Sequence, residues 1–80
     1  ERFTTILIMI HALVKRTDTF GEREYTWIKG RDKADCWRQV DNMFYDDWDY
    51  HCTYDIVEFE ENGIRFNAHT GTILTSETYS

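Results

Sequence analysis

Proline is absent from the chain, and glycine occurs only four times. Proline cannot donate a ladder hydrogen bond, so no position here is barred from the interior of a strand. The glycines are Gly21, Gly30, Gly63 and Gly71, and each stands between periodic segments, where a turn would use it. The 80 residues suffice for one domain, 1–80, and an aromatic content of 16% supplies large side chains for its core.

Long apolar runs are also missing. Ile6–Ile10 is interrupted by His11 and the apolar character ends at Val14, well short of the roughly 20 residues of a membrane span. Glu1 and Arg2 do not form the basic start of a signal peptide. The two cysteines form no disulfide framework. We therefore expect a cytoplasmic protein that does not bind a membrane.

The chain has few groups that could perform nucleophilic catalysis. Its serines are Ser76 and Ser80, both near the C-terminus, and no glycine-rich phosphate loop is present. Cys36 and Cys52 have no neighbours in sequence that would activate a thiolate, and free cysteine is common in protein cores. We predict that the protein is not an enzyme and uses no cofactor.

Two groups of residues suit metal ions by type but not by arrangement. Cysteine and histidine occur at Cys36, His51, Cys52 and His69. His51 and Cys52 are adjacent on an expected strand, so their side chains point to opposite faces. The pairs Asp47-x-Asp49 and Glu58-x-Glu60 could hold Mg²⁺, but no lysine lies near them in the sequence. We predict no metal site, and a small metal-dependent enzyme remains an alternative.

Hydrophobic periodicity predicts five or six elements. Strands are expected at Phe3–Arg16, Glu22–Lys29, Tyr50–Glu61 and Ile64–Ala68, with a further strand at Thr72–Thr75, and a helix is expected at Lys33–Tyr45. Asp32 is a candidate N-cap, with Asp35 three residues later. Apolar residues follow at helical spacing: Ala34, Trp37, Val40 and Phe44, extended by Cys36 and Met43.

Asn62-Gly63 is the clearest local signal, because both positions of a two-residue hairpin loop need positive φ. This turn pairs Phe59 with Phe66 and Glu60 with Arg65. One face of the hairpin then carries Val57, Phe59, Ile64, Phe66 and Ala68, and the other carries Glu58, Glu60 and Arg65.

The element order predicts an α+β, two-layer fold of the type ββαββ(β). A right-handed crossover places the third strand beside the first, which gives an antiparallel sheet of four or five strands in the order 2-1-3-4(-5), with one helix on one face. The first strand is central because it is apolar on both faces. Leu7, Met9 and Leu13, with Ile56 or Tyr54, are then left exposed on the uncovered face. Such patches mark interfaces, so we predict a homodimer or a partner site there.

Charge is unevenly distributed along the chain, whose net charge is −6. Through Arg38 there are eight Lys or Arg and six Asp or Glu, whereas from Gln39 onward nine acids face Arg65 alone. An acidic protein is a poor ligand for phosphates, so we expect no direct binding to nucleic acid. A basic, nucleic-acid-binding protein is the complementary partner.

Carboxylates and aromatic residues alternate over Tyr45–Tyr50, and further acids follow on the next strand. Rigid aromatic anchors and a field of one sign are typical of an interface. The predicted contact residues are Asp46, Asp47, Trp48, Asp49, Asp55, Glu58, Glu60 and Glu61. Solvated surface acids with core aromatics are the structural alternative.

In size and charge the chain resembles the small acidic phage-encoded inhibitors of host defence, including anti-CRISPR proteins that mimic nucleic acid. The resemblance rests on Tyr45–Tyr50 with Asp55, Glu58, Glu60 and Glu61. It implies a viral, non-catalytic inhibitor that blocks a basic groove. A second functional hypothesis is a structural or assembly protein that dimerises through the uncovered sheet face.

Overall fold

The burial of side chains alternates along the first strand and distinguishes the two faces of the sheet. In the computed structural model, which describes residues 9–74, Ile10, Ala12 and Val14 are buried while the residues between them are only partly buried. The elements are β1 (Ile10–Thr17), β2 (Arg23–Gly30), α1 (Lys33–Tyr45), β3 (Thr53–Glu61) and β4 (Ile64–Asn67). The predicted first strand extended back to Phe3, and residues 3–8 lie outside the described part.

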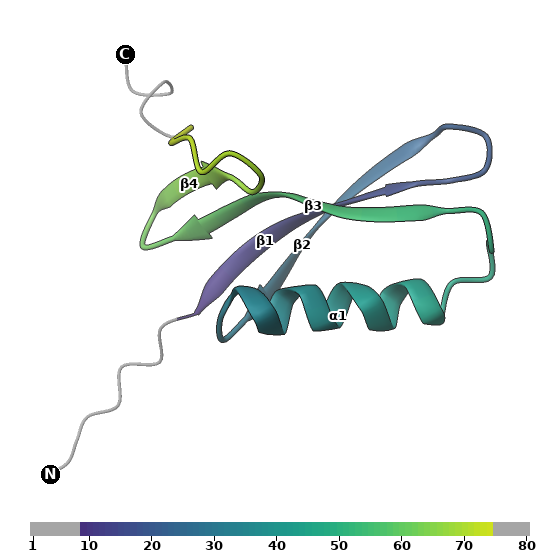
Figure 1. The fold of residues 1–80 in the computed structure, drawn as a ribbon, viewed down its shortest axis with the longest axis horizontal. Helices are drawn as coiled ribbons and strands as arrows, with labels where there is room; N and C mark the ends of the chain where they lie inside the picture. Colours follow the sequence, from purple (N-terminus) through teal and green to yellow (C-terminus); the bar gives the residue numbers. More distant parts are fainter. Residues whose placement is uncertain (1–8, 75–80) are drawn as a thin grey trace, which may run out of the picture.

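The strands form one antiparallel sheet in the order β2-β1-β3-β4. Figure 1 shows α1 running along one face of this sheet. The predicted α+β architecture, the strand order and the central place of the first strand are therefore confirmed. The helix packs against β1, β2 and β3, and no helix formed by residues 9–74 covers the opposite face of the sheet.

The helix begins where its cap predicts. The Asp32 carboxylate accepts a hydrogen bond from the Asp35 backbone N–H at 2.8 Å. Cys36 and Val40 face the sheet and are buried. Close packing at the start of α1 requires Gly30, because a Cβ there would lie 2.8 Å from Cys36 Sγ.

The apolar stripe of α1 is rotated from the predicted one. Its buried centre is Cys36 and Val40, with Met43 packed against the core, whereas Trp37 and Phe44 are 38% and 43% exposed. Ala34, predicted in the stripe, is exposed. The two rings border an open hollow of about 330 Å³ between α1 and the start of β3.

The core lies between the helix and the three longer strands. It consists of buried residues from β1, α1 and β3, namely Ile10, Ala12, Val14, Cys36, Val40, Ile56 and Phe59. No helix within residues 9–74 combines the length and apolarity needed to cross a membrane.

A β-bulge at Val57 changes which residues of β3 enter this core. Leu13 pairs with Glu58 and Val14 with Ile56, so Val57 has no partner of its own on β1. Ile56 is fully buried. The prediction that Ile56 or Tyr54 would be exposed on the uncovered face is therefore wrong, because the extra residue reverses the alternation between Phe59 and Ile56.

The hairpin between β3 and β4 has the predicted register. Phe59 pairs with Phe66 and Glu61 with Ile64, across a turn in which Asn62 and Gly63 have φ of 55° and 83°. The predicted last strand is reduced to an isolated bridge between Phe66 and Ile73, and Thr75 lies outside the described residues.

Candidate functional site

Arg16 and Asp47 join the basic and acidic halves of the chain. Arg16 Nε donates to one carboxylate oxygen of Asp47 at 2.7 Å, and Nη2 donates to the other at 3.0 Å. The Tyr54 hydroxyl donates to the same carboxylate. The side chains of Arg16 and Asp47 are 15% and 5% exposed. A two-point geometry of this kind fixes both side chains.

These contacts shift the ionisation of all three groups. The hydrogen bond from Arg16 holds the pKa of Asp47 well below its usual range, and the bond to Asp47 raises the pKa of Arg16. Burial, together with the bond to Asp47, raises the pKa of Tyr54 to about 12. Asp47 is therefore a charged structural group at neutral pH, with both oxygens already engaged.

The Asp49 carboxylate links the β1–β2 loop to the α1–β3 loop by hydrogen bonds. It accepts hydrogen bonds from the Thr19 hydroxyl at 2.6 Å and the Thr19 backbone N–H at 3.0 Å, and Asp49 is 7% exposed. The His51 backbone N–H donates to it at 2.9 Å. The bond from Thr19 lowers the pKa of Asp49. Because His51 lies in this turn, β3 begins at Thr53 rather than at the predicted Tyr50.

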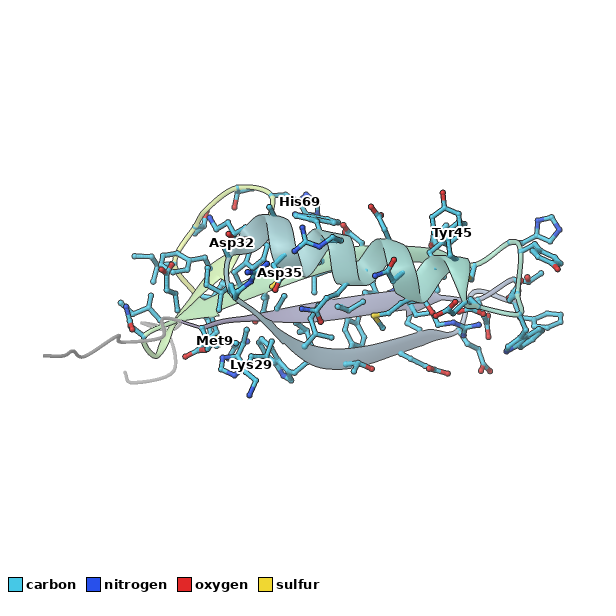
Figure 2. All side chains as sticks on the ribbon, turned by 90° about the horizontal axis from the view of Figure 1, so that it is seen from below. Met9, Lys29, Asp32, Asp35, Tyr45 and His69 are labelled. Carbon is cyan, nitrogen blue, oxygen red and sulfur yellow. The ribbon has the colours of Figure 1, made fainter. Side chains whose placement is uncertain are left out.

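Four large aromatic side chains surround this junction and point into solvent. Tyr45 ends α1, Trp48 and Tyr50 flank Asp49, and Phe20 follows Thr19. Their exposed fractions are 82%, 80%, 87% and 86% respectively. We call these four residues the aromatic end. Figure 1 shows the β1–β2 loop and the α1–β3 loop at the same end of the molecule, and Figure 2 labels Tyr45 there.

The loop that carries Phe20 is closed by its own hydrogen bonds. The Asp18 carboxylate accepts from the backbone N–H groups of Phe20 at 2.8 Å and Glu22 at 2.9 Å. Phe20 was not among the predicted contact residues. The signal for it was a phenylalanine inside a turn segment, where no periodic neighbour could bury it.

The predicted acidic residues do not form one continuous surface. Asp46 and Trp48 are exposed at the aromatic end, whereas Asp47 and Asp49 turn inward. Three others lie on strand β3 and have partners: Asp55 with His69 at 2.9 Å, Glu58 with Arg65 at 2.7 Å and Glu60 with His11 at 2.9 Å. Glu61 lies beside the β3–β4 turn. The contact residues predicted from the charge pattern are thus divided among separate places.

Neither the thiols nor the carboxylates form a metal centre in the described part of the chain. Cys36 and Cys52 are free and buried, and burial raises the pKa of both thiols. His51 is exposed while its neighbour Cys52 is buried. Within residues 9–74, no three His, Cys, Asp or Glu side chains come close enough to hold a metal ion.

The uncovered sheet face is less apolar than the predicted dimer interface. Met9 and Leu13 are half-buried there, and Leu7 lies outside the described residues. The most exposed apolar side chains on this face are Tyr25 and Trp27 on the edge strand β2. The self-association predicted for this face is untested.

Comparison of the chain with protein-family models, with curated proteins and with solved structures gave no match.

Proposed function

We propose that the protein is a non-catalytic, cytoplasmic binding module that engages a basic protein surface, of the kind nucleic-acid-binding proteins present, through its aromatic end. One observation carries the proposal. Four aromatic side chains are at least 80% exposed, and three of them, Phe20, Trp48 and Tyr50, adjoin the hydrogen-bonded pair of Thr19 and the buried Asp49. Exposed aromatic clusters on ordered backbone are typical of interface anchors.

Burying the four rings against a partner would release enough free energy to offset much of the cost of association. Full burial of an apolar side chain contributes about 1.5–3 kcal/mol, so four rings supply roughly 6–12 kcal/mol. Association costs about 4–15 kcal/mol. The rings therefore offset the cost of association without giving tight binding alone, and the preorganised loops reduce that cost. Electrostatic attraction must supply the remaining free energy of binding.

The charge next to the aromatic end favours a cationic partner. Trp48 borders an open hollow of about 520 Å³ that is also lined by Arg16, Glu24, Met43, Asp46, Asp47 and Tyr54. Three carboxylates and one guanidinium leave an excess of two negative charges around it. A lysine or arginine side chain of a partner fits this hollow, with its charge near the Trp48 ring.

The set of residues that we expect in the contact differs from the set predicted from the sequence. Asp46 and Trp48 remain candidates from the sequence, and Phe20, Tyr45 and Tyr50 join them. Asp47 and Asp49 support the site from beneath, so reversing their charge would damage the loops as well as the contact. Inhibition of host defence is the biological role that the resemblance suggests for such a module, and it stays a proposal.

Affinity capture from cell extract, followed by mass spectrometry, tests the proposal. The wild-type chain is compared with Trp48→Ala and with Trp27→Ala, a matched control that removes the same ring from the sheet. We expect a basic protein that is captured by the wild type and the control, is released by salt and is lost with Trp48→Ala. Equal capture by Trp48→Ala, or a captured partner without a basic surface, would overturn the proposal.

A further inference from the structure

Edge strand β2 carries two aromatic rings between two cations on the uncovered face. Ile28 packs against the core and Gly30 is buried beneath α1, so the intervening positions face away from the helix. These positions are Arg23, Tyr25, Trp27 and Lys29, which we call the basic-aromatic stripe. All four are exposed, the two rings by 54% and 46%. Figure 2 labels Lys29 on this side of the molecule.

A third cation, from the neighbouring strand, adjoins the stripe. Lys15 of β1 is the register partner of Tyr25, and Leu13 is that of Trp27. Within residues 9–74, Lys15, Arg23 and Lys29 have no carboxylate within ion-pair distance. The stripe and Lys15 together therefore present three positive charges that form no ion pair within residues 9–74, around two exposed rings, with Asp55 opposite Lys15 on β3.

The carboxylates on the same face come from β3, where Asp55 is the register partner of Lys15 and Glu60 lines a hollow with Trp27. Asp55, Glu58 and Glu60 all belong to β3, and each has the cationic or histidine partner described above. Since β3 is separated from β2 by β1, the two strands lie about 9.5 Å apart. Exposed charges at that separation are largely screened, because the Debye length is about 8 Å at physiological ionic strength. Although the net charge of the chain is −6, edge strand β2 presents positive charge on this face.

The occupant that suits the stripe is a flexible polyanion with planar groups. Tyr25 and Trp27 are two residues apart on one strand, so their rings are spaced by roughly 6.7 Å. Bases stack on such rings only when they are unstacked from their own neighbours, as in a single strand, while lysine and arginine hold the phosphates. A second copy of this chain docked through the same face would set the stripe cations against identical cations.

We propose that the basic-aromatic stripe binds single-stranded nucleic acid, with bases stacked on Tyr25 and Trp27 and phosphates held by Lys15, Arg23 and Lys29. This site goes beyond the proposed function and shares no residue with the aromatic end. It differs from the expectation, drawn from net charge, that the protein makes no direct contact with nucleic acid.

Fluorescence anisotropy with a labelled oligothymidylate, and with a duplex of equal length, tests the proposal. We expect the single strand to bind more tightly than the duplex. Three phosphate contacts give a salt slope of about −2, so affinity should fall roughly 20-fold between about 50 and 200 mM salt. Tyr25→Ala and Trp27→Ala should each weaken binding by about 5- to 160-fold. Lys29→Ala should weaken binding and also reduce the slope by about 0.7.

Two controls keep the outcome interpretable. Trp48→Ala removes the same kind of ring from the aromatic end and should leave oligonucleotide binding unchanged, while it abolishes capture of the basic partner. Trp27→Phe retains a stacking ring, so it should bind more tightly than Trp27→Ala even if both variants are less stable.

Three results would overturn the proposal. These are no binding of the wild type at low salt, equal binding of single strand and duplex, and binding that survives loss of both rings. Sedimentation that shows a dimer dispersed by Trp27→Ala, without oligonucleotide binding, would assign the stripe to a second copy of the chain instead.

Discussion

The guanidinium of Arg16 holds the carboxylate of Asp47 across 31 positions of sequence, with donor–acceptor distances of 2.7 and 3.0 Å. One residue comes from the more basic half of the chain and the other from the acidic half. Their pairing turns a carboxylate inward that the charge pattern alone places on the surface. The same ion pair secures the loop that carries Trp48, so the interior contact and the proposed binding surface depend on each other.

Replacing Asp47 by asparagine should lower the unfolding midpoint in urea, because Arg16 loses its charged partner while it stays largely buried. The adjacent Asp46→Asn is the matched control. It removes the same charge from an exposed side chain and should change stability by no more than about 0.5 kcal/mol. Equal midpoints for the two variants would contradict the role assigned to the ion pair.

Stability should fall with acidification because Asp47 and Asp49 have a lower pKa in the folded chain than in the unfolded chain. The unfolded chain then binds more protons, so their contribution is complete above the unfolded value of about 3.9 and is lost as pH falls through the folded values. Urea midpoints measured from about pH 6 downward test this. Asp49→Asn should flatten the decline, and an unchanged profile in that variant would exclude Asp49 as a source.

Because of the bulge in β3, we expect truncation of two neighbouring residues to cost different amounts of unfolding free energy. Ile56 is fully buried, so Ile56→Ala should cost about 2–5 kcal/mol of unfolding free energy. Val57 is only partly buried, and Val57→Ala should cost about 1 kcal/mol. Denaturant unfolding of both variants measures the difference. A larger loss of unfolding free energy for Val57→Ala than for Ile56→Ala would indicate that Val57 rather than Ile56 is buried. That result would contradict the observed register.

Both thiols should be unreactive in the folded protein. Cys36 and Cys52 are buried, and burial raises the pKa of each, which disfavours the reactive thiolate. Labelling with a thiol reagent should therefore proceed through unfolding, about 10³-fold or more slowly than in denaturant. Rapid modification of one cysteine under native conditions would show that its cover opens locally.

Local signals in the sequence determined most of the secondary structure. The helix at Lys33–Tyr45 follows from an N-cap and an apolar stripe, and the β3–β4 turn follows from Asn62-Gly63. These features depend on residues a few positions apart, so the sequence displays them directly. The strand order also followed, because a right-handed crossover and a central strand apolar on both faces leave few arrangements.

Only the tertiary structure decided which charges are free. Arg16 with Asp47 and Thr19 with Asp49 are contacts between residues about 30 positions apart, and the bulge at Val57 exists only in the pairing of two strands. Net charge treats every ionised side chain alike, whereas folding pairs some of them internally and leaves others, such as Arg23 and Lys29, without an ion-pair partner among residues 9–74. Composition therefore bounded the class of protein, and the spatial sorting of its charges and rings defined the two surfaces proposed to bind partners.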